Sequence, residues 1–406
     1  MKIVFVNRFY APDDSATSQM LTDLAAALAA TGSDVHVVAS RLRHDAPSAS
    51  LAPRERIDGV DVHRVWSTAF GRAGTAGRAL DYLTFCVAAS LRLWRLARRN
   101  DVVVAKTDPP LISVPVAWVA RLRGARLVNW LQDVFPEVAA ELGVPLARGP
   151  VGWLLRWLRD GSLRHAAANV VVGQRMRERV SALGVDPARV AVIANWADGA
   201  RLRPVDRESN PLRAEWGLRD RFVVGYSGNM GRAHEFQTVL DAAAALHGRA
   251  DIAFLFVGGG AQRATLAAAA AEQGVPALLL KPLQRRESLG RSLGAADVHL
   301  VSLLPALEGL VVPSKFYGIA AAGRPTLFVG DPDGEIGAAV RAADCGYAVR
   351  RGDVAALVAA IESLRGDPAL RERMGHNARR SFEACWDKPL AIAKWRTLLE
   401  RVARAR

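Results

Sequence analysis

The sequence predicts two α/β domains, each built around a parallel sheet, and three observations support this expectation. The chain has 406 residues, too many for one ordinary α/β core and enough for two of about 200 residues each. Short apolar runs rich in Val, Ile and Leu recur along it, each followed by a longer segment with helical periodicity. The runs are apolar on both faces, which is typical of parallel strands covered by helices on each side.

The strands are expected in two sets. The first set occupies 3–6, 35–38, 102–104, 127–131, 170–172 and 190–193. The second set occupies 222–226, 253–257, 277–280, 298–301, 326–329 and 346–349. A polar stretch over 199–210, with Pro204 and Pro211 close by, separates the two sets. The expected domains are therefore 1–198 and 199–388, and a C-terminal helix over 389–406 follows them.

Composition and charge disfavour several classes of protein. The net charge of +14 is spread evenly, with 25 Lys/Arg against 18 Asp/Glu in 1–200 and 29 against 22 in 201–406. Because neither half has a basic tail or a basic motif interleaved with aromatics, no nucleic-acid partner is expected. The three cysteines are far apart and lack metal-ligand spacing, which favours a reducing cytoplasm and no metal site. No apolar stretch reaches the length of about 18 residues that would predict a membrane-spanning helix.

A glycine-rich turn follows the first strand of the second domain. Segment 227–232 reads Ser-Gly-Asn-Met-Gly-Arg, and helical periodicity resumes at about Glu235. Such a turn lets the backbone approach a ligand while helix amides face an anion, and Arg232 adds a guanidinium suited to phosphate. The alternative is a purely structural turn, but two glycines beside an arginine favour phosphate binding. A second glycine cluster, 258–260, follows the next strand and is a weaker signal by itself.

A third polar group precedes a helix of small residues at 315–322. Glu308 offers a carboxylate for ribose or sugar hydroxyls, while Ser314 and Lys315 are suited to phosphate oxygens. The alternative is a helix that is capped by Ser314 and packs its alanine face on the sheet. The two interpretations are compatible.

Two loops of the first domain should line the ligand-binding crevice, because they follow parallel strands. The loop 8–18 contains Asp13 and Ser18, which either bind a ligand or serve as turn and helix-capping residues. The other loop follows the strand 127–131 and contains Asp133 and Glu137. These two carboxylates lie at the same edge of the sheet, where a group that accepts a proton from a bound ligand is expected. Asp133 is the first candidate, and Glu137 could equally be an ordinary residue of a first helical turn.

The segments 78–99 and 148–164 combine Leu and Trp with clustered arginines. This composition suits helices that lie against anionic headgroups and predicts peripheral membrane contact. The alternative is that both segments are amphipathic helices whose apolar side covers the sheet.

The order of these motifs resembles glycosyltransferase family 4. It is most similar to the bacterial subgroup that builds surface polysaccharides, which includes N-acetyl-L-fucosamine transferases. The resemblance is carried by 226–232, 257–260 and 313–325. It extends over nearly the whole chain through 9–13, 132–137 and 195–198.

The resemblance implies a GT-B fold, in which two Rossmann-like domains face each other across a cleft. It implies that a nucleotide sugar, with UDP the favoured nucleotide, binds mainly to the C-terminal domain. The acceptor, a saccharide or a polyprenyl-pyrophosphate-linked saccharide, would bind to the N-terminal domain. Transfer would retain the anomeric configuration of an N-acetylated amino sugar or deoxy sugar. The family pattern includes no metal or further cofactor, and it places the enzyme in the cytoplasm, at the inner face of the membrane.

The resemblance also assigns residues to each site. The nucleotide-sugar residues are Gly228, Asn229, Gly231, Arg232, Gly259, Leu283, Glu308, Ser314, Lys315 and Tyr317. The acceptor residues are Tyr10, Asp13 and Ser18. The catalytic candidates are Asp133 and Glu137, the carboxylates that follow the strand 127–131, and the alternative in this family is front-face attack, in which the leaving phosphate takes the proton without a protein base.

The chain departs from the family pattern in two ways. Many members have two glutamates separated by seven residues, and one of the two is missing here in either alignment, which puts the ribose contact in doubt. The lysine that often follows the phosphate arginine is also absent, and Lys315 could supply its charge. Two alternatives therefore stay open, a catalytically silent nucleotide-binding scaffold and a sugar-nucleotide epimerase of the same fold.

Overall fold

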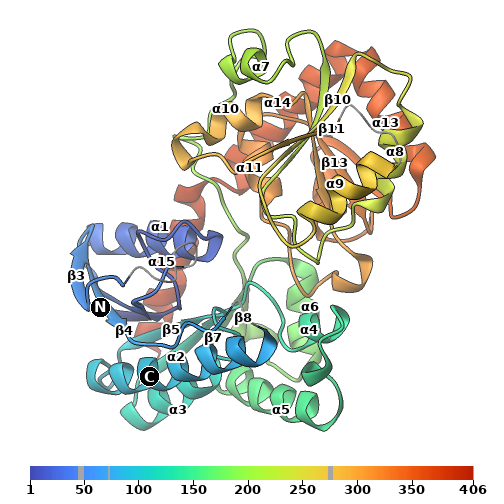
Figure 1. Ribbon diagram of the computed structural model, residues 1–406. Helices are drawn as coiled ribbons and strands as arrows, with labels where there is room; N and C mark the ends of the chain where they lie inside the picture. The colour runs from blue at the N-terminus through green and yellow to red at the C-terminus, as the bar shows by residue number, and fades with distance from the viewer. Residues whose placement is uncertain (44–49, 72–73, 273–277, 406) are drawn as a thin grey trace. The chain divides into compact units, whose positions relative to one another are not determined.

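The chain forms two compact units in a computed structural model that describes residues 1–43, 50–71, 74–272 and 278–405 (Figure 1). The first unit comprises Met1–Ala194 together with Ile392–Arg406, and the second comprises Asn195–Ala391. Each unit is built around one sheet, and in both sheets nearly all neighbouring strands are parallel. The predicted class of two Rossmann-like α/β domains is confirmed.

The first sheet has the order β3-β4-β2-β1-β5-β6-β7-β8. It contains all six strands that were predicted from apolar runs, and most of their residues are buried. These strands are β1 (Lys2–Val6), β2 (Asp34–Ser40), β5 (Val102–Lys106), β6 (Arg126–Trp130), β7 (Ala168–Val171) and β8 (Val190–Val192).

Two further strands, β3 (Arg54–Ile57) and β4 (Val60–Val65), form a hairpin at one edge of this sheet. They are antiparallel to each other, whereas β4 continues the sheet in parallel with β2. Asp58 and Gly59 make the turn, both with positive φ (47° and 81°), as a two-residue hairpin turn requires. β3 has no apolar run because it is an exposed edge strand, where charged residues discourage pairing with other chains.

Helices cover this sheet between its strands. They are α1 (Ala16–Ala30), α2 (Thr75–Leu96), α3 (Ser113–Arg123), α4 (Glu137–Glu141), α5 (Gly149–His165) and α6 (Gln174–Ala182), with short 3-10 turns at Pro145–Ala147 and Pro187–Arg189. The C-terminal helix α15 (Lys388–Arg404) joins the first unit from Ile392 onward. There Trp395 packs on Trp130 at 4.6 Å between ring centroids, and Arg126 donates a hydrogen bond to the carbonyl of Val402.

The second sheet has the order β11-β10-β9-β12-β13-β14, and every pairing in it is parallel. The strands are β9 (Phe222–Ser227), β10 (Ile252–Val257), β11 (Leu278–Lys281), β12 (Val298–Ser302), β13 (Thr326–Gly330) and β14 (Gly346–Arg350). All six predicted strands are present, although the expected first residue of β11, at position 277, lies outside the described residues.

The helices of the second unit pack an alanine- and leucine-rich core against this sheet. They are α7 (Pro211–Glu215), α8 (Gln237–Ala245), α9 (Arg263–Glu272), α10 (Leu289–Gly294), α11 (Lys315–Ala321), α12 (Glu335–Ala342), α13 (Val354–Gly366) and α14 (Pro368–Cys385), with 3-10 turns at Arg286–Ser288 and Pro305–Leu307.

A buried carboxylate joins the starts of β9 and β12, and its removal should destabilise the second unit. Asp297 accepts hydrogen bonds from the Val223 amide at 2.7 Å, from Arg213 at 3.2 Å and from Arg207 at 2.8 Å. Since Arg213 is itself buried, Asp297→Ala would leave a guanidinium without a counter-charge and should lower the free energy of unfolding by about 3–5 kcal/mol. Urea denaturation measures this. The exposed helix cap Asp353→Ala is the control, with an expected loss of about 1 kcal/mol. Equal losses in the two variants would contradict the expectation.

Candidate active site

Two loops at the carboxyl edge of the second sheet lie directly against each other. One follows β9 through Gly228 (φ +128°), and the other follows β10 through Gly258 (φ +141°) and Gly260 (φ +134°). A Cβ on Gly258 would lie 2.1 Å from the carbonyl oxygen of Gly228, and the Met230 amide donates to the carbonyl of Gly259 at 2.7 Å. Glycine is therefore required by the close approach of the two loops. At this edge of the sheet, where doubly wound folds bind their ligands, the two loops therefore expose backbone atoms that a ligand can approach closely.

The ammonium group of Lys315 lies beside this pair of loops. Lys315 is the first residue of α11, and its Cε is 3.5 Å from the position that a Cβ on Gly228 would occupy. Its Nζ donates to the hydroxyl oxygen of Tyr226 at 2.5 Å and to Nε2 of His234 at 2.9 Å. Tyr226 in turn donates to the carbonyl of Asn229 at 2.8 Å, which ties the lysine to the glycine-rich turn.

The charges of this group follow from its hydrogen bonds. Nδ1 of His234 lies 2.7 Å from the carbonyl oxygen of Ser302, which can only accept, so Nδ1 carries the proton and Nε2 accepts from Lys315. Burial and the charge of Lys315 lower the pKa of His234 to about 3, so the imidazole is neutral. Burial lowers the pKa of Lys315 to about 7. No carboxylate of the described residues forms an ion pair with Lys315, so an anionic ligand at the turn would stabilise its charged form.

In the first unit, Asp133 lies just beyond the carboxyl end of β6. It lines a cavity of about 20 Å³ together with Lys106, Ser113 and Arg159. Its Oδ1 atom is buried and accepts no hydrogen bond from the protein groups that the structure describes. Burial raises the pKa of Asp133 to about 7, and the nearby Asp108 carboxylate adds to this shift. A carboxyl group with that pKa can exchange a proton with a ligand hydroxyl near neutral pH.

Comparison with known proteins identifies the family. Residues 15–196 match the model of the glycosyl transferase 4-like domain, and residues 209–381 match that of the glycosyl transferases group 1. The glycosyltransferase WbjE of Pseudomonas aeruginosa is 31% identical over 278 residues, which are 68% of each chain. The chain belongs to the glycosyltransferases. A second relative is the colanic acid biosynthesis glycosyl transferase WcaI of Escherichia coli K12. It is 27% identical to the present chain over 351 residues, which are 83% of this chain and 85% of WcaI.

Solved structures show that the fold of this glycosyltransferase is GT-B. Anabaena HepE, crystallised with UDP and glucose, superposes with a TM-score of 0.74 at 15% identity over 99% of this chain and 100% of its own. Sucrose-phosphate synthase of Thermosynechococcus elongatus superposes with a TM-score of 0.77 at 17% identity over 99% of each chain.

The structure brings several of the predicted donor residues together. Gly228, Asn229 and Gly231 form the turn after β9, Gly259 lies in the facing loop, and Lys315 approaches from α11. These residues come from three separate segments of the second unit. Their role in binding the donor stays a prediction, and their proximity makes it testable.

Three other predicted donor residues are exposed. Arg232 follows directly after the turn, and Ser314 precedes α11 at its N-cap position without a side-chain capping bond. Leu283, two residues beyond β11, has 67% of its surface exposed. The proposed alternative role of Ser314, a hydrogen-bonded helix cap, is therefore wrong in this structure, and its hydroxyl is accessible.

Two predicted donor residues have structural partners. Tyr317 is only 3% exposed and packs edge-on against Phe316 and Trp386, with ring centroids 5.6 and 5.9 Å apart. Glu308 accepts a hydrogen bond from the Glu335 amide at 2.7 Å and so caps the start of α12. Both side chains make contacts that stabilise the fold. The motif alone could not distinguish such a structural role from a contact with the ligand.

The helix after the glycine turn begins later than expected. α8 starts at Gln237, and the buried carboxylate of Glu235 accepts a hydrogen bond from the Thr238 amide at 3.0 Å. One of the first amides of this helix is therefore already bonded to a side chain, and the contact of the other amides with an anion stays a prediction. Lys315 adds a positive charge at the same turn.

Glu137 is held in a bidentate ion pair, which distinguishes it from Asp133. Its two carboxylate oxygens accept hydrogen bonds from the buried Arg159 at 2.7 and 2.9 Å. Glu137 is also the first residue of α4, as the alternative interpretation of the sequence expected. The hydrogen bonding therefore favours Asp133 over Glu137 as the group that exchanges a proton.

The predicted acceptor residues lie at the same edge of the first unit. Asp13 accepts a hydrogen bond from the Ser15 amide at 2.8 Å, at the turn that precedes α1. Tyr10 and Ser18 are buried, and their hydroxyl oxygens have no hydrogen-bond partner among the described protein groups. Both hydroxyls are enclosed by the protein, so their contact with an acceptor stays a prediction, whereas Asp13 shapes the turn.

One residue of this edge, Lys106, was not singled out from the sequence. Lys106 closes the apolar strand β5 with no exposed surface, and its Nζ lies 3.6 Å from the ring centroid of Trp130, with no hydrogen-bond acceptor among the described protein groups. Burial holds the pKa of Lys106 well below its usual range, and Asp108 opposes this shift. The sequence does mark Lys106, because it is a polar residue at the end of an apolar strand, the same feature that predicted a role for Asp133.

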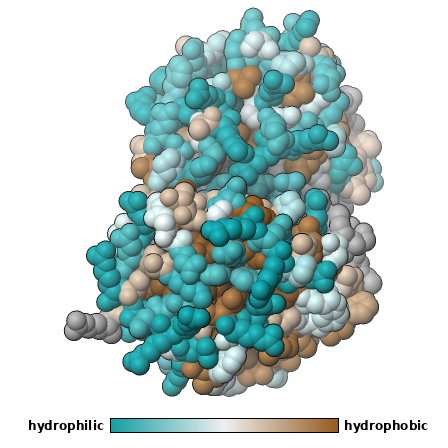
Figure 2. Space-filling view, turned by 90° about the vertical axis from the view of Figure 1, so that its left-hand side faces the viewer, coloured by the Kyte–Doolittle hydropathy of each residue, from teal (hydrophilic) through white to brown (hydrophobic). Residues whose placement is uncertain are grey.

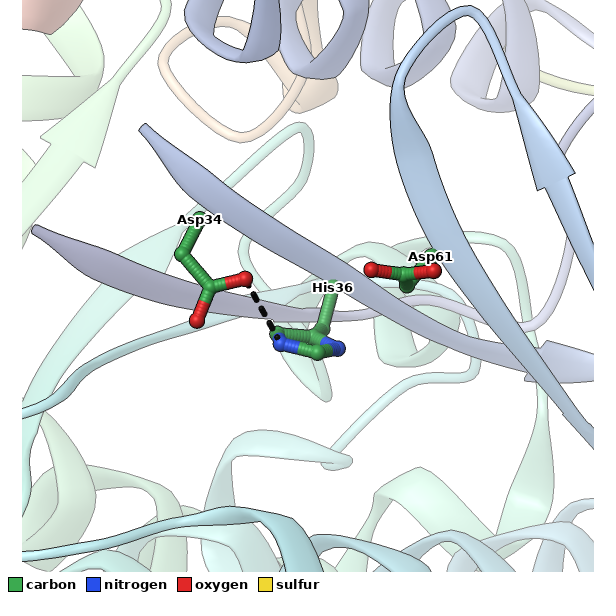
Figure 3. A group of neighbouring side chains, drawn as sticks. All are labelled: Asp34, His36 and Asp61. Carbon is green, nitrogen blue, oxygen red and sulfur yellow. Dashed lines mark ion pairs between the residues drawn. The ribbon is translucent and has the colours of Figure 1, made fainter. Parts of the chain in front are cut away.

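One group of potential metal ligands occurs among the described residues, at the opposite edge of the first sheet (Figure 3). Asp34 and His36 lie near the start of β2, and Asp61 lies near the start of β4. Nε2 of His36 is 3.1 Å from the Asp34 carboxylate, and its Nδ1 is 3.1 Å from Nε2 of His63. Both ring nitrogens thus have protein partners. The expectation that the enzyme needs no metal stays a prediction.

Proposed function

We propose that this glycosyltransferase moves a sugar from a UDP-sugar to a saccharide or polyprenyl-pyrophosphate-linked acceptor during surface-polysaccharide synthesis, with retention of configuration. The observation on which the donor side rests is Lys315, a half-buried ammonium beside the glycine-rich turn that has no counter-charge among the described residues. The diphosphate of a nucleotide sugar supplies the missing negative charge. The UDP bound by HepE supports the choice of nucleotide, and the name of WcaI supports a polysaccharide product.

The chemistry assigns a role to each unit. The bond between the anomeric carbon and the β-phosphate oxygen breaks, and a bond from that carbon to the acceptor oxygen forms. Lys315 and the turn amides stabilise the charge on the departing diphosphate. The proton of the acceptor hydroxyl passes either to Asp133 or to the departing phosphate oxygen, which front-face attack would favour. The sugar class remains the N-acetylated amino sugar or deoxy sugar that the family resemblance implies.

The proposed acceptor also indicates a location. A polyprenyl chain holds its saccharide at the membrane, so the enzyme would act at the cytoplasmic face as a peripheral protein. Exposed apolar residues in segments 78–99 and 148–164 support this location.

Calorimetric titration with UDP, GDP, ADP and dTDP tests the proposal. We expect selective binding of UDP, and we expect Arg232→Ala to weaken it about tenfold because one guanidinium contact to phosphate is lost. Arg219→Ala, which removes an exposed arginine before β9, is the control and should bind normally.

No binding to any of the four nucleotides would contradict the transferase assignment. UDP binding without sugar transfer to any acceptor would instead favour the silent scaffold. Conversion of the donor in the absence of an acceptor would favour the epimerase.

A further inference from the structure

Large hydrophobic side chains are exposed mainly in the first unit. Among the described residues, the second unit exposes only Leu283 and Leu390, although the two units are of similar size. Figure 2 shows hydrophobic side chains at the surface between hydrophilic ones. In the first unit most of the exposed hydrophobic residues belong to α2, α3 and α5.

Helix α2 has two apolar stripes. The buried stripe faces the sheet and includes Phe85, Ala89 and Leu93. The exposed stripe has the same helical spacing, and its members are 43–62% exposed. It consists of Leu80, Leu83, Val87, Leu91 and Trp94. Since one apolar stripe is sufficient to attach a helix to its sheet, the second one requires another explanation.

Helices α3 and α5 extend this apolar surface. Trp118 and Leu122, one turn apart on α3, are 63% and 67% exposed. Trp153 and Trp157, one turn apart on α5, are 63% and 56% exposed. Helix α3 packs against both α2 and α5, so the three exposed stripes are neighbours. We call them together the α2–α3–α5 surface.

The charges of these helices are almost all positive. Their only acidic residues are Asp81, which is buried and accepts a hydrogen bond from Thr68, and Asp160, which pairs with Arg159 at 2.6 Å. The arginines are Arg78, Arg92, Arg95, Arg121, Arg123, Arg156, Arg159 and Arg164. Arg159 is buried and already paired with Glu137 and Asp160. A second copy of the chain would bring the other positive charges together, whereas anionic lipid headgroups neutralise them.

We propose that the α2–α3–α5 surface binds the face of a bilayer that contains anionic phospholipids. Exposed tryptophan, leucine and arginine on one surface are the composition of interfacial helices. None of the helices in the described part of the chain combines the length and apolarity needed to cross a membrane, so the contact is with the interface.

The position of this surface fits a lipid-linked acceptor, and this part of the inference rests on the proposed function. In a parallel sheet, each connecting helix starts near the carboxyl edge, where Asp133 lies. Ser113 at the start of α3 and Arg159 of α5 line the same cavity as Asp133. The surface therefore adjoins the candidate acceptor site, and the saccharide can reach it while the lipid stays in the bilayer.

Vesicle flotation tests the surface with the full chain. We expect binding to vesicles that contain phosphatidylglycerol and weak binding to pure phosphatidylcholine. The combined variant Trp118→Ser, Trp153→Ser, Trp157→Ser should lower the partition coefficient about a hundredfold, because three interfacial aromatic anchors are lost. Leu390→Ser, an exposed apolar position of the second unit outside both candidate sites, is the control and should bind like the wild type.

UDP titration of the same variants separates this inference from the proposed function. Vesicle binding that depends on the tryptophans supports the surface even if UDP does not bind. Wild-type protein that stays off anionic vesicles, or a tryptophan variant that binds them equally well, would overturn the surface even if UDP binds. A dimer in solution that the tryptophan variant dissociates, without vesicle binding, would assign the surface to a second copy of the chain.

Discussion

Replacing Lys315 by methionine is expected to weaken UDP binding about a hundredfold, because the variant loses a charge-assisted contact to the diphosphate in a desolvated site. The methionine side chain is about as long as that of lysine, so the packing against Tyr226 is largely kept. The measurement is calorimetric titration with UDP at pH 7. The melting temperature should change little, because the loss of the hydrogen bonds to Tyr226 and His234 is offset by removal of a partly buried ammonium group.

The matched control is Lys281→Met in the same unit. Lys281 ends β11, and its ammonium lies 5.7 Å from the centroid of the Trp216 ring, whereas that of Lys315 bonds to Tyr226 and His234. We expect normal UDP affinity in this variant. Equal affinity losses in the two variants would show that the effect of Lys315 is not local.

Replacing Asp133 by asparagine is expected to lower kcat about a hundredfold to ten-thousandfold, the range for loss of a positioned proton acceptor. The affinity for UDP should stay unchanged, because Asp133 belongs to the first unit and the glycine-rich turn to the second. Since the pKa of Asp133 is about 7, the wild-type rate should rise with pH up to about 7 and then level off. UDP release from UDP-sugars with a lipid-linked acceptor measures both effects.

Glu137→Gln serves as the matched control for Asp133→Asn. It weakens the ion pair with Arg159, so the free energy of unfolding should fall by about 1–3 kcal/mol while kcat is kept. If Asp133→Asn retains full activity with an unchanged pH profile, the departing phosphate oxygen takes the proton, and Asp133 has no catalytic role.

The sheets could be predicted from the sequence because their strands are buried on both faces. Runs such as 102–104 and 298–301 leave little ambiguity, and the structure confirms both. The hairpin of β3 and β4 was missed because an edge strand exposes Arg54, Glu55 and Arg56 and so has no apolar run. The Asp58–Gly59 pair was the signal that could have revealed it. The packing of α15 on the first unit was beyond reach, because it depends on contacts between residues as distant in sequence as Trp130 and Trp395.

The sequence could predict single residues of the candidate site, because its motifs directly follow predicted strands, but it could not predict how these residues contact one another. Gly228 and Lys315 could be proposed separately, but their proximity through Tyr226 requires the folded chain. The motif in 308–325 could not show that Glu308 caps α12 or that Tyr317 packs against aromatic rings. The environments of buried polar groups, which decide their charge, are properties of packing rather than of local sequence.

Proton uptake on UDP binding tests most directly whether Lys315 receives the donor diphosphate. At pH 8 the free lysine is mostly neutral because its pKa is about 7, and the bound anion raises that pKa, so affinity should fall as the pH rises above 7. Titrations at pH 8 in buffers of different ionisation enthalpy should show uptake of close to one proton per UDP. Lys315→Arg, which is always charged, should bind UDP without this uptake. UDP binding by the wild type without proton uptake, or the same uptake in Lys315→Arg, would contradict the assignment of Lys315 to the diphosphate site.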